Sequence, residues 1–264
     1  MFQPLYVAAT GLAAFQDELL NITNNLANAK TTGFKRGRTE MESLFYIEKS
    51  FKDELQQALG EGIREVSPEF GTGVRVAATP KDFVQGTIET TNNPLDIAIT
   101  GEGFVQVRMP DGSLAYTRAG NLHADNEGNL VDPNGHLLEP PIVLPEGTTA
   151  VVIQQDGTVL VSVSNQLTQS DIGQITLAKF SNPGGLKSIG QNLYASTESS
   201  GDPIVGNAGD EGFGVINQYA LEGSNVDVIS EMMRMVMVQR VFDTITKAVS
   251  SYEGMLTSLE RMKQ

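Results

Sequence analysis

Two amphipathic helices are predicted at the ends of the chain, because apolar residues recur there with the seven-residue period of a coiled-coil seam. In the N-terminal stretch, leucines stand seven residues apart and further apolar residues follow three positions after each, at Leu5, Leu12, Leu19 and Leu26 and at Ala8, Phe15, Ile22 and Ala29. In the C-terminal stretch, the same spacing links Val228, Met235, Phe242, Val249 and Leu256 with Val238, Ile245, Tyr252 and Leu259. Such positions are typical of helices that pack along a long shared seam.

Both helices carry start and stop signals. The first is expected over residues 4–29, because Pro4 is tolerated in a first helical turn and the turn residues of 31–33 follow its last turn. The second is expected to be capped by Asn225 or Asp227 and to end with basic residues, which suits the helix dipole.

Between the helices the period of the apolar pattern changes to two, which predicts short strands. The expected strands are Val74–Ala77, Leu95–Ile99, Phe104–Val107, Leu114–Thr117, Val151–Ile153, Val159–Val163, Ile175–Phe180 and Gly214–Gln218. Turn signals such as Asp111-Gly112 and Asp156-Gly157 separate them, and regular hairpins favour an antiparallel body over a parallel α/β sheet. Residues 196–212 are expected to form a long surface loop.

The segment between the first helix and the first strand is less regular. Apolar spacing indicates short helical pieces that glycines and Pro68 interrupt, at Met41, Leu44, Phe45, Leu55 and Leu59. We expect an extended, partly helical excursion here.

The predicted fold is therefore α+β, with long N- and C-terminal helices forming a coiled-coil-like bundle and a mainly antiparallel β body between them. The expected domains are the N-terminal helix (1–34) paired with the C-terminal helix (225–264) as a discontinuous assembly domain, the excursion (35–75), and a β-rich outer body (76–224).

Composition and charge narrow the possible partners. The 264 residues are 40% hydrophobic and 19% charged, which is typical of a globular protein. The net charge of −14 argues against nucleic acid and anionic membranes, because phosphate groups are bound by clustered Lys and Arg. With no run of about 18 apolar residues and no visible signal peptide, we expect no membrane insertion and either a cytoplasmic location or export without a cleaved signal.

The sequence offers little for catalysis. It has no Cys, which removes thiol nucleophiles, disulfides and Cys-based zinc sites. His123 and His136 lie beside turn signals and are expected to be exposed rather than metal ligands. Gly101-Glu102-Gly103 lacks the third glycine of a dinucleotide-binding loop and precedes a strand. We expect no catalytic residue, no metal and no cofactor, and therefore no enzyme.

Two interpretations of the heptad pattern remain open. The helices either cover the core of an ordinary domain or pack against other copies of the chain. Their terminal position, their Ala and Met content and the breadth of the C-terminal stripe favour the second, since Met232, Val241, Ala248, Met255 and Met262 widen it. The candidate self-assembly seam is Leu5, Leu12, Phe15, Leu19, Ile22, Leu26, Val228, Met235, Val238, Phe242, Ile245, Val249, Tyr252, Leu256 and Leu259.

Several segments resemble the bacterial flagellar basal-body rod and hook family, and within it the distal rod members. The resemblance covers nearly the whole chain, at Asn24-Asn25-Leu26-Ala27-Asn28, Thr32-Gly33-Phe34-Lys35-Arg36, Gly71-Thr72-Gly73-Val74-Arg75, Thr91-Asn92-Asn93-Pro94-Leu95-Asp96-Ile97-Ala98-Ile99, Gly101-Glu102-Gly103-Phe104, Tyr116-Thr117-Arg118-Ala119-Gly120, Ser188-Ile189-Gly190-Gln191-Asn192-Leu193-Tyr194, Ser224-Asn225-Val226-Asp227 and Gln239-Arg240.

The resemblance implies a structural subunit of the distal rod that self-assembles into a hollow helical tube, transmits torque and passes export substrates. It further implies a homopolymer that contacts proximal rod, hook and surrounding ring proteins, located in the cell envelope between inner membrane and hook, and exported by the flagellar type III apparatus. Its motif residues in this chain are Asn25, Asn28, Gly33, Phe34, Asn93, Asp96, Gly101, Gly103 and Phe104. The alternatives are a proximal rod subunit and, in a different class, a secreted β-rich binding module.

Each motif residue suggests a structural role. The amides of Asn25 and Asn28 are suited to satisfying backbone groups where the first helix ends. Gly33 permits a positive φ at the helix exit, and Phe34 is expected to anchor the chain on its own β neck. The turn at Asn93 is expected to lead into a buried strand, and the two glycines of 101–103 to permit a sharp hairpin or bulge.

Overall fold

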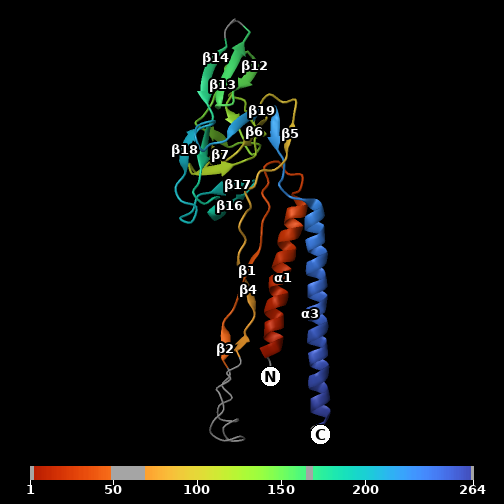
Figure 1. Cartoon of the computed structure of the whole chain (residues 1–264). Coiled ribbons are helices and arrows are strands. Elements are labelled where there is room, and N and C mark those ends of the chain that lie inside the picture. Colours follow the sequence, from red (N-terminus) through yellow and green to blue (C-terminus); the bar gives the residue numbers. More distant parts are fainter. Residues whose placement is uncertain (1–2, 49–68, 165–168, 263–264) are drawn as a thin grey trace. The chain divides into compact units, whose positions relative to one another are not determined.

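The computed structural model describes residues 3–48, 69–164 and 169–262 (Figure 1). The chain divides into two compact units. Of the described residues, the first unit comprises 3–24, 37–48, 69–80 and 229–262, and the second comprises 25–36, 81–164 and 169–228. The terminal helices thus belong mainly to one unit and the β body to the other, while the domain boundaries expected from the sequence stay a prediction.

Two long helices dominate the first unit. Helix α1 spans Gln3–Ala27 and helix α3 spans Val228–Met262, close to the predicted bounds. They run side by side in opposite directions (Figure 1). The fold class predicted from the apolar periods is confirmed, because both helices form and the strands between them pair in antiparallel fashion.

A two-stranded ribbon completes the first unit. Strand β1 (Glu40–Ser43) pairs with β4 (Val74–Ala78), and β2 (Tyr46–Glu48) pairs with β3 (Glu69–Gly71), both antiparallel. The helical pieces expected near Met41, Leu44 and Phe45 are therefore wrong: a partner strand far along the chain determines the conformation, and local spacing does not reveal it. The part of that prediction that rests on Leu55 and Leu59 lies outside the described residues.

The second unit is built around one large sheet. Its main path runs β16–β17–β8–β7–β11–β10–β9, with β15 paired to both β7 and β18. The bounds are β7 Phe104–Arg108, β8 Leu114–Thr117, β9 His123–Ala124, β10 Leu130–Val131, β11 Leu137–Glu139, β15 Thr176–Lys179, β16 Lys187–Gly190, β17 Leu193–Ala195 and β18 Ile204–Asn207. Strand β18 corrects the expectation of a continuous surface loop over 196–212, since residues 204–207 pair along the whole of β15.

Smaller ladders and one short helical turn surround this sheet. Strands β12, β13 and β14 form a three-stranded sheet, β6 pairs with β19, and β5 pairs with β20. Their bounds are β5 Ile88–Thr90, β6 Ile97–Thr100, β12 Thr148–Ile153, β13 Thr158–Val163, β14 Ser170–Gln174, β19 Val215–Gln218 and β20 Ala220–Glu222, with the 3₁₀ turn η1 at Pro183–Gly185.

The second unit has a hydrophobic core of its own. One cluster gathers buried aliphatic side chains from β6, β7, β10–β13, β15 and β19, including Ile97, Val159, Leu177 and Ile216. A second cluster is aromatic: the rings of Phe104 and Phe180 meet edge to face, with centroids 5.8 Å apart. The β body therefore packs around a core that includes no residue of either heptad seam.

The two histidines differ. His123 is exposed, as predicted, but His136 is buried, which corrects the expectation for it. The turn that holds it closes on Asp132, whose Oδ1 accepts the backbone N–H groups of Asn134 and His136 and whose Oδ2 lies 2.9 Å from His136 Nδ1. The imidazole is thus part of a carboxylate-centred turn.

Within the described residues, no cluster of three or more His, Asp or Glu side chains is arranged to hold a metal ion. None of the described helices is long and apolar enough to cross a membrane.

Candidate assembly interface

The seam residues of α1 lie beside the most covered face of that helix, where Gly11, Ala14 and Asn25 are buried. Ile22 is buried, and the other five, Leu5, Leu12, Phe15, Leu19 and Leu26, are half-buried. On the other side of the helix Tyr6 and Leu20 are more than half exposed. The helix therefore keeps apolar surface beyond the seam that the heptad pattern identified.

The seam residues of α3 lie on the most covered side of that helix over most of its length. Val238 is buried, and Met235, Phe242, Ile245, Val249, Tyr252 and Leu256 are half-buried. Val228 and Leu259, at the two ends of the series, are exposed, with 41% and 61% of their surface accessible.

The two helices make both close and charged contacts. A Cβ atom on Gly11 of α1 would lie 3.8 Å from Ile245 Cδ1 of α3, so small residues allow the backbones to approach. Nearer the other end of the pair, Arg234 of α3 donates to Glu18 of α1 at 3.2 Å. These contacts fix which turns of the helices face each other.

The ribbon of the first unit packs closely on α1. Gly73 has φ +124°, and a Cβ atom there would lie only 2.1 Å from Thr10 Oγ1, so any other residue would clash. The glycine that resemblance placed in the segment 71–75 is thus explained by close approach of the ribbon to α1.

An apolar groove opens between these three elements. It has a volume of about 1070 Å³ and is lined by α1, by the ribbon and by the second half of α3. Its lining is Pro4, Leu5, Val7, Ala8, Gly11, Tyr46, Phe70, Gly71, Gly73, Val74, Ile245, Ala248, Val249, Tyr252 and Met255. Among the described residues that line this groove there is no charged side chain.

A second apolar surface lies on the opposite side of α3, in its first turns. We call it the methionine face, and it comprises Ile229, Met232, Met233, Val236 and Met237, each between 48% and 69% exposed. Further along α3 that side becomes polar. The methionine face therefore covers a limited length of helix.

The end of α1 turns into the second unit through the Asn-rich motif. Asn25 is buried, and its carbonyl accepts the N–H of Asn28 at 3.1 Å. The Asn28 side chain accepts from the Thr31 hydroxyl at 3.1 Å. Gly33 has φ +68°, as the sequence predicts, and donates its N–H to the Glu222 carbonyl at 2.7 Å.

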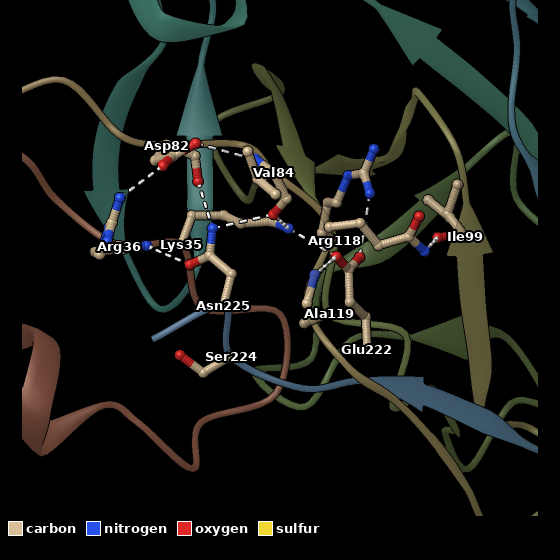
Figure 2. Close-up of polar contacts among 12 residues, drawn as sticks. Lys35, Arg36, Asp82, Val84, Ile99, Arg118, Ala119, Glu222, Ser224 and Asn225 are labelled. Carbon is tan, nitrogen blue, oxygen red and sulfur yellow. Dashed lines mark hydrogen bonds and ion pairs between the residues drawn. The ribbon is translucent and has the colours of Figure 1, made fainter. Parts of the chain in front are cut away.

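A buried ionic cluster follows directly (Figure 2). Lys35 Nζ lies 2.7 Å from Glu222 Oε1, and both side chains are fully buried. Arg118 lies 3.2 Å from the second carboxylate oxygen of Glu222. Burial lowers the pKa of the Lys35 ammonium below its ordinary value, and the hydrogen bond and charge of Glu222 oppose that shift.

Backbone groups complete the coordination of this cluster. Lys35 donates to the Val84 carbonyl at 2.8 Å, and Arg118 donates to the Gly101 carbonyl at 2.6 Å. The Gly86 N–H donates to Glu222 Oε1 at 2.9 Å. Buried charges with this many partners hold their segments in one geometry.

Asn225 extends the cluster on the C-terminal side. Its side-chain oxygen accepts the Arg36 N–H at 2.8 Å, and its amide donates to the carbonyls of Asp82 and Val84 (Figure 2). The expectation that it might cap the last helix is thus wrong, because its side chain is engaged within the second unit. Helix α3 begins directly after the other candidate, Asp227.

The remaining motif residues shape the β body. Asn93 donates to Asp96 at 2.8 Å in the turn before β6, and Asp96 is buried. Gly101 has φ +108°, and a Cβ atom there would meet the Gly214 backbone at 2.9 Å. Gly103 (φ +139°) leads into β7, which begins with the buried Phe104.

Phe34 anchors the N-terminal segment as predicted from the sequence. It is buried, and the Lys81 ammonium lies 4.8 Å from the centre of its ring. Both residues belong to the second unit.

Sequence reasoning missed the partners of the buried charges. Lys35 and Arg118 stood inside the motif segments, but no role was assigned to them, and Glu222 was not singled out. The available signal was a charged residue directly after the apolar Phe34 in a glycine-rich turn. Its partner could not be inferred, since Glu222 follows 187 residues later.

Comparisons with known proteins agree with this architecture. Three family models match: the flagella basal body rod protein model over residues 5–35, the D1 domain of the flagellar hook protein FlgE/F/G over 98–161, and the C-terminal model of the flagellar basal body rod FlgEFG protein over 217–262. They fall on α1, on the β body, and on the last strands with α3.

Full-length relatives give the same result. The flagellar basal-body rod protein FlgG of Buchnera aphidicola (subspecies Acyrthosiphon pisum) is 38% identical over 99% of this chain and 100% of its own. The FlgG proteins of Caulobacter vibrioides and Borreliella burgdorferi are 37% and 36% identical, over 99% and 100% of this chain and 99% and 100% of their own.

Two features of the described residues suit a subunit of a larger assembly: paired terminal helices with exposed apolar faces, and a β body with its own core. The chain belongs to the flagellar basal-body rod protein family. It is a structural subunit of the rod in the flagellar basal body, and its full-length similarity to FlgG proteins agrees with the distal rod assignment.

Proposed function

We propose that copies of this chain polymerise through the first unit into the hollow helical tube of the distal rod, which transmits torque and lets export substrates pass. The observation that carries the proposal is the exposed apolar surface of the first unit. An apolar groove and the methionine face lie on one pair of helices, although the β body packs around a separate core. Apolar patches that the subunit itself does not cover are typical of contact surfaces.

The charge distribution supports contact between identical chains. Each copy carries a net charge of −14, so copies repel one another at most surfaces. The lining of the groove and the residues of the methionine face are uncharged, so contact there desolvates no ion.

The same proposal places the subunit among its neighbours. By its family, the rod is continuous with proximal rod and hook proteins and is surrounded by ring proteins, between the inner membrane and the hook. The subunit reaches that place by export without a cleaved signal, inserts in no membrane, binds no nucleic acid or cofactor, and performs no catalysis. Its role is mechanical. The buried charges of the second unit hold together, under load, the segments by which the chain enters and leaves that unit.

Charge substitution in the seam tests the proposal. Phe242→Asp or Leu256→Asp places a carboxylate in the half-buried seam of α3, where desolvation disfavours it. We expect soluble monomers with an unchanged β signal in circular dichroism and no tubes in electron micrographs of concentrated protein. The matched control is Thr244→Asp, which adds the same charge at an exposed position of the same helix.

The outcomes separate clearly. Tubes from wild type and from the Thr244 variant, with none from the Phe242 variant, support polymerisation through the helices. Normal tubes from the Phe242 and Leu256 variants contradict it. A wild-type chain that stays monomeric at high concentration contradicts polymer formation itself.

A further inference from the structure

The groove of the first unit has the shape of a receptor for bulky side chains. Small residues from all three of its walls, Ala8 and Gly11 of α1, Gly71 and Gly73 of the ribbon and Ala248 of α3, leave space between the larger ones. At about 1070 Å³ it is slightly larger than the usual range for small-molecule pockets, and its lining is mainly apolar, as in grooves that accept one face of a helix.

The methionine face has the matching pattern. Its residues, Ile229, Met232, Met233, Val236 and Met237, are spaced i, i+3, i+4, i+7 and i+8, which is the spacing with which a helix presents anchors to a groove. Three of the five are methionines, whose unbranched side chains fill irregular apolar spaces. The face thus projects bulky, adaptable groups, whereas small residues in the groove lining leave space between its larger side chains.

We propose that the methionine face of one copy docks in the groove of a second copy, between its α1, its ribbon and the second half of its α3. This pairing rests on the proposed polymerisation and specifies which surfaces meet.

The occupant is a second copy because each copy carries both halves of the contact in one unit. The groove includes α3 from Ile245 onward, and the methionine face ends at Met237, about two helical turns earlier. The two surfaces are therefore distinct on each copy, and neither carries a charge in a chain of net charge −14.

The symmetry of the contact follows. A patch that pairs with a different patch on the next copy makes a head-to-tail interface, and such interfaces form open helical polymers unless the rotation closes a ring. A face that paired with itself would stop at a dimer. The pairing of the methionine face with the groove thus accounts for growth along a rod.

Site-specific crosslinking tests the pairing, because the chain has no cysteine of its own. Met233→Cys and Ala248→Cys variants, carrying different affinity tags, are mixed, assembled and treated with a short bismaleimide. We expect a dimer that contains both tags. The matched control replaces Ala248→Cys with Ser250→Cys, two residues along the same helix, exposed and outside the groove lining.

The alternatives give different products. Dimers that carry only the Met233→Cys tag would show the methionine face paired with itself and overturn the proposal. Equal yields of the dimer with both tags from Ala248→Cys and from Ser250→Cys would also overturn the proposal. In dilute monomer, Ala248→Cys should react rapidly with a soluble maleimide and slow down at least tenfold in tubes; slow reaction in the monomer would mean that the chain covers its own groove.

A charge exchange gives a second, independent measurement. Met233→Lys and Ala248→Glu, each separately, should raise the critical concentration for tube formation about tenfold or more, since each buries one unpaired charge. The double variant should return it to near wild type, because the two charges then meet across the interface.

These outcomes distinguish the two proposals. If the two substitutions impair tube formation additively in the double variant while wild type still forms tubes, the proposed pairing is wrong and polymerisation itself is not contradicted. Absence of tubes from wild type overturns both.

Discussion

Lys35 Nζ and Glu222 Oε1 lie 2.7 Å apart, although the two residues are separated by 187 positions in sequence and both side chains are completely buried. Lys35 follows the turn after α1, and Glu222 ends β20 shortly before α3. The ion pair therefore joins the segments by which the chain enters and leaves the second unit, and Arg118 holds the other oxygen of the carboxylate.

Removal of one partner of this pair should destabilise the β body strongly. In Lys35→Met the Glu222 carboxylate stays buried but loses the positive charge and the hydrogen bond of Lys35. Breaking such a pair costs about 3–5 kcal/mol of unfolding free energy. Urea unfolding followed by circular dichroism measures it. Arg38→Gln is the control, since its pair with Glu40 is about half exposed and should contribute less than about 1 kcal/mol. Equal effects of the two substitutions would contradict the role of burial.

The same lysine predicts a pH dependence. Burial lowers its folded-state pKa, so between that value and the ordinary one near 10.4 the unfolded chain binds more protons than the folded chain. Stability from Lys35 should then rise as pH increases through this window. The unfolding free energy of wild type relative to Lys35→Met should therefore increase as the pH rises toward the ordinary lysine pKa. A decrease over that range would show that the folded state holds the proton more tightly than the unfolded one.

Gly33 should tolerate no side chain. It has φ +68°, and a Cβ atom would lie 2.6 Å from the Ala119 nitrogen, so Gly33→Ala adds a backbone clash to the cost of a positive φ. Gly112→Ala is the matched comparison, because that glycine has φ +84° but no atom within 4 Å of the added Cβ. We expect the Gly112 variant to lose about 1–2 kcal/mol and the Gly33 variant clearly more, measured by urea unfolding. Similar losses of unfolding free energy in the two variants would mean that the backbone near Ala119 moves away from the added Cβ atom at little cost.

The sequence predicted most of what depends on local periodicity. The two helices were placed within a few residues, and β8 has the predicted bounds, Leu114–Thr117, because apolar spacing and flanking turns are local signals. Strand β18 was missed, because its conformation depends on pairing with β15 rather than on its own pattern.

The candidate site was predicted less completely for the same reason. The heptads predicted the two helices, but the contacts of α1 with α3 include Gly11 and Glu18, which lie outside the heptad positions. The groove also needs the ribbon, whose β1 pairs with β4 more than 30 residues later. The Lys35–Glu222 contact joins still more distant residues. Pairings of this kind arise from the tertiary fold, and a single sequence does not encode them in any local pattern.

The close contact of Gly73 with Thr10 should control docking of the ribbon on α1. Gly73→Ala places a Cβ atom 2.1 Å from Thr10 Oγ1, which forces the ribbon away and changes the groove. We expect Gly73→Ala to impair tube formation and Thr10→Ala to restore part of it in the double variant, because the hydroxyl is then gone. Electron microscopy and sedimentation measure both. Equal assembly by the Gly73 variant and wild type would show that the ribbon plays no part in the interface.

Limited proteolysis of dilute monomer should remove the first unit and leave the second. Helices α1 and α3 cover only one side of each other, and isolated helices are marginal in water, so local opening should expose them first. The resistant core should begin near Asn25 and end near residue 228, because Asn25 is buried and Asn225 bonds to Arg36. If the protease also cuts within 37–48, the short piece 25–36 should stay bound, held by Gly33 and Lys35 on Glu222. Mass spectrometry of the digested protein under native and denaturing conditions tests this. In wild type, the 25–36 piece should be detected under both conditions, bound to the core in the native spectrum. In Lys35→Met, it should be missing from the native spectrum. Full protection of both helices in a proven monomer would mean that the first unit is stable without a neighbour.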